Sequence, residues 1–230
     1  EKQKINEIKK IYITASGGPF LNLNINKFKN VKPKDALKHP KWKMGKKISI
    51  DSSTLMNKIL ELAEAQKLFN LSDKKVDIII HPESLVHAII QLKNGLTKFI
   101  YHKTSMIIPI ANAIFEKNLN IEEFYNSKNN MKKPIENLNF KKINNKIFPM
   151  IKLKNKINKF PSSSIIINAS NEILVDQFLR KKIPFLSIYK TIMKILNDRN
   201  YRKYAIRKPK NILEIIKIDQ WARESVLKKI

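Results

Sequence analysis

Residues 48–61 read ISIDSSTLMNKILE. The alternating Ile48-Ser49-Ile50 predicts a brief strand. The polar run Asp51-Ser52-Ser53-Thr54 supplies side chains that commonly cap helices, so we expect a helix to begin there and to run to about Phe69. Much of its apolar face is expected from Leu55, Ile59, Leu62 and Leu68. Strand and helix signals so close together favour a fold that contains both types of element.

Two segments precede this stretch. Residues 8–15 are rich in β-forming residues and predict a buried strand, which ends at the breaker cluster Ser16-Gly17-Gly18-Pro19. Residues 22–47 are polar and are interrupted by Pro33 and Pro40, so we expect loop and short helix there.

Three further segments follow it. Residues 76–80 form a compact apolar run that predicts a strand. Residues 85–92 and 96–101 flank Asn94-Gly95, a strong hairpin signal. Residues 107–115 predict a helix, with Pro109 suited to its first turn.

The C-terminal half is predicted to be helical. From 117 to 159 the chain is rich in Asn and Lys with weak periodicity, although Phe140, Ile147 and Phe148 offer apolar surface that can pack. Residues 164–197 are helical in pattern with a break near Pro184, and a last helix is expected at 219–229.

These elements predict an α+β fold class. We expect a sheet-and-helix catalytic, substrate-binding domain at 1–116, a linker at 117–148 and a small helical domain at 149–230.

Charge is the strongest compositional signal: the formal net charge is +27 and the pI is about 10.1. Nucleic-acid binding is the first hypothesis that such a charge raises. However, only five of the 46 basic residues are arginine, and the lysines are spread along the whole chain. Arginine is the residue favoured for base recognition and for bidentate phosphate contacts, so the composition argues against a dedicated nucleic-acid surface.

Other classes are excluded more simply. The chain has no cysteine, so disulfides and thiolate metal sites are excluded, which suits a reducing compartment. No apolar run is long enough to cross a bilayer. Cytoplasm is the expected location.

Three local features favour binding of an anion. Glycines in Ser16-Gly17-Gly18 allow backbone amides to approach a phosphate, and the expected helix start at 51–54 offers further amides. Lys58 and Glu61 lie three residues apart, so one helix face can present a cation and a carboxylate. Each feature alone is more commonly a turn, a cap or a solvated ion pair. Their combination carries the hypothesis.

Aromatic and histidine residues suggest two further possibilities. Trp42 and Met44 lie in a polar loop after His39, where a large apolar side chain can cover a ligand or simply anchor the loop. The second possibility, a metal site at the histidines His81, His87 and His102, has no ligand-like spacing, so we expect these to be structural.

Two motifs together carry a family resemblance. The run from Thr14 to Phe20, TASGGPF, precedes a second run from His39 to Glu61, HPKWKMGKKISIDSSTLMNKILE. Their order and spacing resemble the 1-deoxy-D-xylulose 5-phosphate reductoisomerase family. The resemblance continues through IHPESLVH at 80–87 to Met106 and returns in NASNE at 168–172, so it covers most of the chain.

The resemblance implies an enzyme that rearranges a sugar-phosphate substrate and then reduces it with NADPH, using Mg²⁺ or Mn²⁺. By motif match, substrate-binding residues would be Ser16, His39, Trp42, Ser52, Asn57, Lys58 and Glu61. Among these, His39, Lys58 and Glu61 would be catalytic, Glu61 would be a metal ligand, and His39 and Trp42 would belong to a flexible flap. Met44, Gly45 and Met106 would lie near the nicotinamide. Residues 168–172 would support the site from the helical domain.

Departures from the family pattern shape the expectation. The family's N-terminal NADPH-binding domain, and a segment with two more metal ligands, would precede Glu1, so we expect an incomplete chain that is inactive alone. Ser53, Glu83 and Thr104 differ from the residues expected, and Thr104 affects the nicotinamide pocket. The family also implies a homodimer, and a plastid if the source is eukaryotic. The competing hypothesis is a non-enzymatic basic protein that binds anions or nucleic acid.

Overall fold

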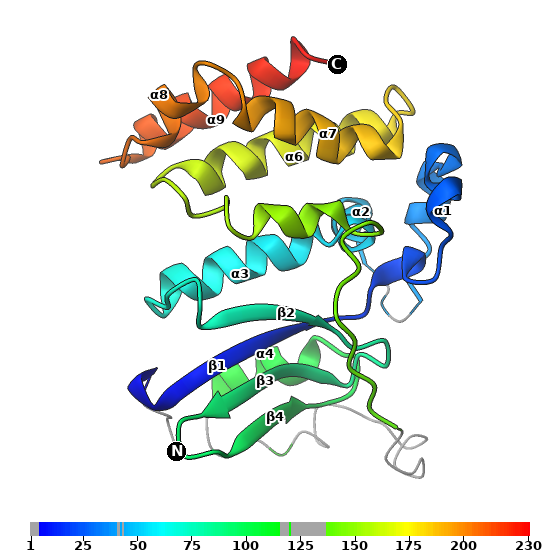
Figure 1. The fold of residues 1–230 in the computed structure, drawn as a ribbon, viewed down its shortest axis with the longest axis vertical. Coiled ribbons are helices and arrows are strands. Elements are labelled where there is room, and N and C mark those ends of the chain that lie inside the picture. Colours follow the sequence, from blue (N-terminus) through cyan, green and yellow to red (C-terminus); the bar gives the residue numbers. More distant parts are fainter. Residues whose placement is uncertain (1–4, 41, 43, 116–119, 121–136) are drawn as a thin grey trace.

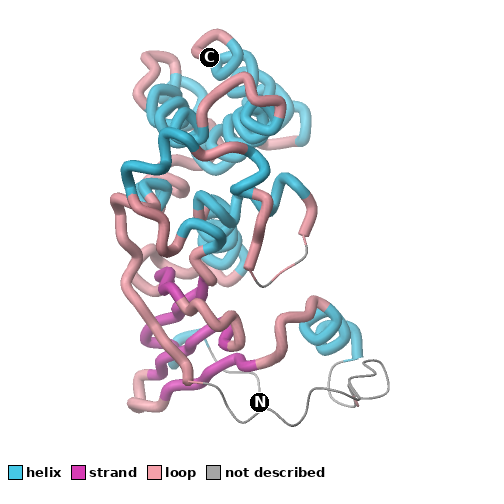
Figure 2. Tube along the Cα trace, turned by 90° about the vertical axis from the view of Figure 1, so that its right-hand side faces the viewer, coloured by secondary structure: helices cyan, strands magenta, loops and turns pink. Residues whose placement is uncertain are grey.

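The computed structural model describes residues 5–40, 42, 44–115, 120 and 137–230. A four-stranded sheet lies at one end of the molecule, and helices are stacked from the sheet towards the C-terminus at the other end (Figure 1). A view turned by 90° shows the same separation of strands and helices (Figure 2). The predicted α+β class is confirmed.

The sheet is mixed, with strand order β2-β1-β3-β4. Its strands are β1 (Ile8–Ala15), β2 (Val76–Ile80), β3 (Val86–Leu92) and β4 (Thr97–Tyr101). β1 pairs parallel with β2, from Ile11 opposite Val76 to Ala15 opposite Ile80, while the β1–β3 and β3–β4 pairs are antiparallel. The strands predicted at 8–15 and 76–80 and the hairpin of 85–92 and 96–101 are confirmed. Gly95 takes the positive φ of 89° that the hairpin turn requires.

The prediction for residues 48–54 is wrong. They belong to α2 (Lys46–Thr54), which ends at Leu55 in the left-handed conformation, and α3 (Met56–Leu68) begins directly after it. Two hydroxyls of this segment donate to carbonyls of α2 and its N-cap instead of capping amides: Ser49 to Gly45 at 3.0 Å and Ser53 to Ile50 at 2.7 Å. A three-residue alternation was too short to distinguish a strand from one helical turn.

The predicted apolar face of α3 is right for three residues and wrong for the fourth. Leu55, Ile59 and Leu62 are buried, but Leu68 is 77% exposed. Six residues correspond to about 1.7 helical turns, so Leu68 emerges on a different side of the helix from Leu62.

Helices form the C-terminal part. They are η4 (Pro149–Leu153), α6 (Ser163–Leu179), α7 (Phe185–Leu196), α8 (Tyr201–Ala205) and α9 (Ile212–Leu227). The break at Pro184 is confirmed. The last helix begins earlier than predicted because Asn211 caps it, accepting a hydrogen bond from the Glu214 amide at 3.0 Å. The short α8 was not predicted.

Several short elements connect these parts. They are η1 (Ile5–Glu7), η2 (Gly18–Phe20), η3 (Ile25–Asn30), α1 (Pro33–Ala36) and α4 (Ile107–Phe115). The mixture of loop and short helix expected for residues 22–47 is confirmed up to Lys46, where α2 begins. α4 was predicted and lies apart from the other helices (Figure 2). No helix in the described part of the chain is long and apolar enough to span a membrane.

The predicted linker, 117–148, lies partly outside the described residues. Its last part is packed: Phe148 is 1% exposed, Phe140 stacks on His81 with ring centroids 4.8 Å apart, and Lys141 pairs with Ile80. The hydrophobic core runs without interruption from Ile80 through Phe148 to the helices. The linker's apolar residues therefore join the sheet to the helical part. The domain boundaries themselves stay a prediction.

Candidate anion-binding site

Two turns that are distant in sequence meet beside the sheet. Ser16-Gly17-Gly18 follows β1, and Ser52-Ser53 lies in the last turn of α2. Gly18 has a φ of 57°, and a Cβ added to it would lie 3.0 Å from the Ser52 carbonyl oxygen. Glycine is thus favoured here by the backbone conformation and by the close approach of the second turn.

The Ser16 hydroxyl is held by two donors. The Gly18 amide donates to Ser16 Oγ at 3.1 Å, and His39 Nε2 lies 3.1 Å from the same oxygen. The Trp42 amide donates to His39 Nδ1 at 2.9 Å, so the neutral ring carries its proton on Nε2 and donates it to Ser16. Burial, and then the positive charge of Lys58, lower the pKa of His39, which favours this neutral form. The hydroxyl proton of Ser16 is left to donate to a ligand.

A second set of polar groups lies at the start of α3. The N-cap of this helix, Leu55, makes no side-chain cap, and the Met56 amide donates to Thr54 Oγ1. The other first-turn amides include those of Asn57 and Lys58. Asn57 Oδ1 is buried without a hydrogen-bond partner among the described residues. Buried polar groups of this kind are normally satisfied, so the arrangement points to a ligand.

Lys58 supplies the positive charge at this place. Its Nζ lies 2.9 and 2.7 Å from the two carboxylate oxygens of Glu61, and its side chain is only 19% exposed. Its charge also lowers the pKa values of His39 and His87, after the larger effect of burial. The charge of the ammonium therefore acts on the two histidines as well as on Glu61.

Trp42 contacts one ring of a stacked pair of imidazoles. Its ring meets His87 edge-on, with centroids 6.1 Å apart, and His87 stacks on His102 at 3.7 Å. His87 Nε2 donates to the carbonyl of His102, and the buried His81 donates from Nδ1 to the carbonyl of Asn139. These contacts support the interpretation of the histidines as structural. They also show that Trp42 is anchored by its ring as well as by its backbone amide.

The structure therefore brings together the candidates Ser16, His39, Trp42, Ser52, Asn57, Lys58 and Glu61, through the contacts given above. Within the described residues, no side-chain hydrogen bond or ion pair connects Met44, Gly45 and Met106, the three candidates for cofactor binding, to these residues. Gly45 precedes α2, and a Cβ added to it would meet nothing within 4 Å. Met106, 58% exposed, precedes α4, and Met44 is half-buried.

The metal candidate is one carboxylate. In the part of the chain that the structure describes, no group of three or more His, Asp or Glu side chains is placed to hold a metal ion. Glu61 can supply one oxygen donor, which alone does not satisfy Mg²⁺ or Mn²⁺. The described residues are therefore at most one part of a metal site.

Sequence reasoning missed two features near this site. Asp51 in α2 is buried and bonded to Asn171 of α6, and Ser84 is a buried hydroxyl without a partner among the described residues, with a φ of 57°. The carboxyl ends of β1 and β2 lie side by side, so the loop with Ser84 begins at the same sheet edge as Ser16. Pairing of Asp51 with a residue so distant in the chain leaves no local signal.

The fold is α+β, and hydroxyl, amide and ammonium groups gather where the turn after β1 meets α2 and α3. Residues 1–69 match a family model described as the 1-deoxy-D-xylulose 5-phosphate reductoisomerase C-terminal domain, and residues 102–225 match one described as the DXP reductoisomerase C-terminal domain. The chain belongs to the 1-deoxy-D-xylulose 5-phosphate reductoisomerase family.

Individual relatives agree with this assignment. The chain is 48% identical over 96% of its length to the reductoisomerase of Pelagibacter ubique, and 42% identical over 94% to that of Campylobacter jejuni. These alignments cover 56% and 58% of the relatives, so the chain spans little more than half of their length.

Solved structures agree too. A DOX-P reductoisomerase in complex with NADPH, fosmidomycin and magnesium superimposes with a TM-score of 0.85 at 30% identity, over 97% of this chain and 55% of that one. The Zymomonas mobilis reductoisomerase in complex with NADPH gives a TM-score of 0.81 at 31% identity, over 97% and 56%. The predicted family and the fold of its catalytic and C-terminal parts are confirmed.

Proposed function

We propose that this chain carries the substrate-phosphate site and the C-terminal part of a 1-deoxy-D-xylulose 5-phosphate reductoisomerase. The enzyme would convert 1-deoxy-D-xylulose 5-phosphate to 2-C-methyl-D-erythritol 4-phosphate in the non-mevalonate synthesis of isoprenoid precursors. The observation that carries the proposal is the meeting of the Gly18 and Ser52 turns beside the start of α3, where the amides of Asn57 and Lys58 lie in the first turn. Family membership and the names of the relatives support the reaction.

Ser16, Ser52, Asn57 and Lys58 are the proposed phosphate ligands. The two hydroxyls and the α3 amides donate hydrogen bonds, and the helix N-terminus adds a favourable dipole for an anion. Lys58 supplies the charge that a phosphate dianion needs, because its hydrogen bonds to an anion are stronger than those of neutral donors. Holding the phosphate in this way fixes one end of the substrate while its carbon skeleton rearranges.

His39 and Trp42 are the proposed cover of the site. The Trp42 amide holds the His39 ring, and the ring in turn holds Ser16, so the covering residues are tied to the phosphate ligand. Such a cover would exclude water from the reacting carbonyl. His39 would keep its proton on Nε2 throughout.

Two cofactors are part of this proposal. NADPH would supply the hydride that reduces the rearranged aldehyde, and Met44, Gly45 and Met106 are the proposed neighbours of its nicotinamide. A divalent ion, Mg²⁺ or Mn²⁺, would polarise substrate oxygens. Glu61 would give one of its ligands, and the others would come from outside the described residues. Cytoplasm is the proposed location, with a plastid as the alternative.

We also propose a homodimer, supported by exposed apolar side chains on two elements. The large side chains of β4 and α4, each between 46% and 66% exposed, are Phe99, Ile100, Tyr101, Ile107, Ile110, Ile114 and Phe115. Exposed apolar side chains in such number commonly mark an interface. Sedimentation of the wild type and of Ile114→Asp tests it: a dimer dissociated by the substitution is expected, and a monomeric wild type would contradict it.

The function is tested by NADPH oxidation with 1-deoxy-D-xylulose 5-phosphate and Mg²⁺ or Mn²⁺. This chain, and the protein expressed from its complete coding sequence, are compared. Turnover by the latter, lost in Lys58→Ala, is the expected result. Absence of turnover in the protein from the complete coding sequence, with correct folding shown by circular dichroism, would contradict the proposal.

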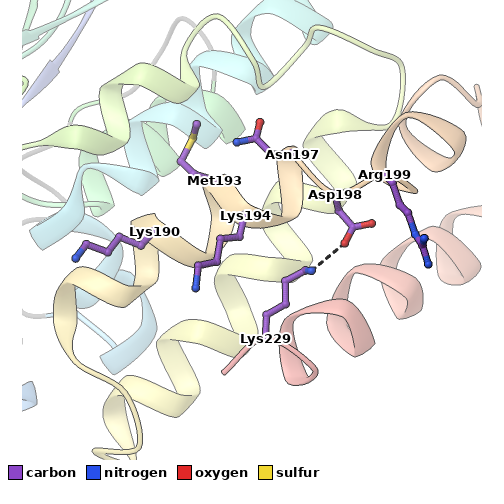
Figure 3. A pocket seen from close by; sticks show the side chains of 7 residues that line it. All are labelled: Lys190, Met193, Lys194, Asn197, Asp198, Arg199 and Lys229. Atoms are coloured by element: carbon purple, nitrogen blue, oxygen red, sulfur yellow. Dashed lines mark ion pairs between the residues drawn. The ribbon is translucent and has the colours of Figure 1, made fainter.

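The competing proposal, a non-enzymatic anion-binding protein, has one observation in its favour. A hollow of about 720 Å³ in the helical part is lined by Lys190, Lys194, Arg199 and Lys229, and its carboxylate, Asp198, is already paired with Lys229 at 2.9 Å (Figure 3). This hypothesis predicts strongly salt-dependent binding of any polyanion. Heparin affinity that falls in Lys190→Ala/Lys194→Ala, without selective sugar-phosphate binding, would favour it over the enzyme.

A further inference from the structure

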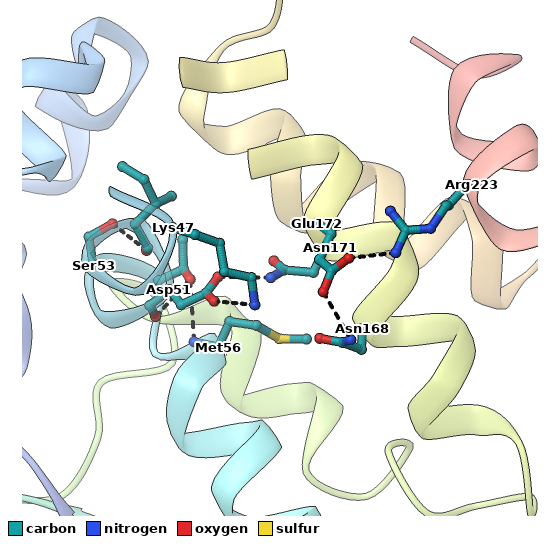
Figure 4. A network of polar contacts seen from close by, with 10 residues as sticks. Lys47, Asp51, Ser53, Met56, Asn168, Asn171, Glu172 and Arg223 are labelled. Carbon is teal, nitrogen blue, oxygen red and sulfur yellow. Dashed lines mark hydrogen bonds and ion pairs between the residues drawn. The ribbon is translucent and has the colours of Figure 1, made fainter. Parts of the chain in front are cut away.

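A buried hydrogen bond connects the helical part to the candidate site. Asn171 Nδ2 in α6 donates to Asp51 Oδ1 in α2 at 2.8 Å, and the two residues are 0% and 2% exposed. The other carboxylate oxygen of Asp51 pairs with Lys47 at 2.9 Å. Figure 4 shows the Asp51 carboxylate between these two partners.

Asp51 is connected in turn to the start of α3. Its backbone carbonyl accepts from the Thr54 hydroxyl at 3.1 Å, and Thr54 Oγ1 accepts from the Met56 amide at 3.3 Å. Met56 is the first residue of α3, directly before Asn57 and Lys58. Ser52 follows Asp51 in the chain. The position of Asp51 therefore affects both the Ser52 hydroxyl and the first residues of α3.

Helix α6, which carries the donor Asn171, is itself held by side-chain contacts with α9. Beside Asn171, Glu172 accepts from Asn168 in α6 and from Arg223 in α9, and Arg223 also bonds to Asp219 (Figure 4). α6 is thus fixed to α9 on the side next to the Asn171–Asp51 contact. The helix that carries Asn171 is therefore itself fixed in place by α9.

A buried carboxylate is a costly way to join two helices, because desolvation of the charge opposes folding and an apolar pair would pack as well. What a charged hydrogen bond adds is direction, since it fixes the angle as well as the distance between its partners. Asp51 directly precedes Ser52, a proposed phosphate ligand, so a fixed angle at Asp51 also fixes the position of the Ser52 hydroxyl.

We infer that Asn171 is a positioning residue, which sets the phosphate-binding turn through Asp51. This inference rests on the proposed function. Asn171→Ala removes the donor and leaves Asp51 buried with one partner fewer. The turn then loses its fixed orientation. We expect the affinity for 1-deoxy-D-xylulose 5-phosphate to fall about tenfold, as for loss of one hydrogen bond to a charged group. In the protein from the complete coding sequence, KM should rise more than kcat falls.

An exchange of the two side chains gives the sharpest test. In Asp51→Asn/Asn171→Asp, the amide introduced at position 51 can donate to the carboxylate introduced at position 171, while the amide oxygen still accepts from Lys47. We expect this double variant to recover most of the affinity that each single variant loses. If the two side chains only fill space, the double variant should show no recovery of affinity. The side-chain volumes barely change in Asp51→Asn or in Asn171→Asp.

Isothermal titration with 1-deoxy-D-xylulose 5-phosphate measures all variants. Ile188→Ala, in the core of α7, is the control for general loss of stability, and Asn171→Ser is used if Asn171→Ala does not fold. Unchanged affinity in Asn171→Ala, or an equal loss in Ile188→Ala, would overturn the inference while Lys58→Ala still abolishes binding. If Lys58→Ala also leaves the affinity unchanged, the proposed function itself is wrong.

Discussion

Gly18 lies against the carbonyl of Ser52 so closely that an added Cβ would be 3.0 Å from that oxygen. The contact joins the turn after β1 to the last turn of α2. It places the Ser16 hydroxyl on the same side of the molecule as Ser52 and the start of α3. The candidate site exists because these two turns touch.

Gly18→Ala is therefore expected to reduce both stability and phosphate binding. The substitution strains a φ of 57° and places the Cβ 3.0 Å from the Ser52 carbonyl oxygen, so the backbone of Ser52 and Ser53 must shift to accommodate it. We expect a loss above about 1 kcal/mol, beyond the usual cost of alanine at positive φ. Denaturant unfolding and titration with 1-deoxy-D-xylulose 5-phosphate measure the two effects.

Gly95→Ala is the matched control for Gly18→Ala. Gly95 also has positive φ, at 89°, but open space surrounds its Cα. It should lose stability through strain alone and keep its affinity for the sugar phosphate. Equal loss of affinity in both variants would show that contact with Ser52 is not what matters.

Leu62 and Leu68 give a test of the core within one helix. Leu62 is 0% exposed and Leu68 is 77% exposed. Leu62→Ala should lower the free energy of unfolding by about 2–5 kcal/mol. Leu68→Ala should change it by about 0.5 kcal/mol or less. Similar losses, measured by urea denaturation, would mean that the described orientation of α3 is wrong.

Stability should fall in mild acid because of His39. Burial and the charge of Lys58 lower its pKa below the usual 6.5, so the unfolded chain binds the extra proton first. The stability that the neutral ring contributes is complete above the unfolded pKa and is lost as the pH falls through and below it. His87 has a pKa lowered mainly by burial and acts in the same direction.

His39→Ala should therefore make the free energy of unfolding less dependent on pH between about 5 and 7.5, with a residual slope from His87. Denaturant titrations at several pH values measure the slope. A slope that is unchanged in His39→Ala would contradict the burial of His39 beside the charge of Lys58.

Glu61→Gln should tighten phosphate binding when no divalent ion is present. Glu61 accepts from Lys58 with both oxygens, and an amide, which is neutral, would hold the ammonium less firmly. A partly exposed ion pair of this kind contributes at most about 1 kcal/mol, so the gain should be up to about fivefold. Titration with the sugar phosphate in chelator measures it. Weaker binding of the sugar phosphate to Glu61→Gln would show that Glu61 orients Lys58 and does not compete with the phosphate for it.

Strands and the later helices were predictable because their signals are local. The β-rich runs, Asn94-Gly95 and Pro184 each act on their own neighbours, and the structure bears them out. The structure of segment 46–55 was not predictable, because serine and threonine hydroxyls form hydrogen bonds both at helix ends and inside helices. Only the left-handed Leu55, which no sequence signal marks, separates α2 from α3.

The site was predicted in part. Its residues were found by resemblance, and the structure brings Ser16, His39, Ser52 and Lys58 together. The Asp51–Asn171 contact was missed because it depends on how α6 packs against α2, which no local pattern encodes. Contacts of Met44 and Met106 with a cofactor stay a prediction.

The most direct test compares 1-deoxy-D-xylulose 5-phosphate with 1-deoxy-D-xylulose, which lacks the phosphate, by isothermal titration to wild type and Lys58→Ala. Wild type should bind only the phosphorylated sugar, and Lys58→Ala should lose at least about tenfold in affinity for it, as expected for a charged hydrogen-bond donor. Equal affinity for the two sugars, or full affinity in Lys58→Ala, would contradict the phosphate site described by Ser16, Ser52, Asn57 and Lys58.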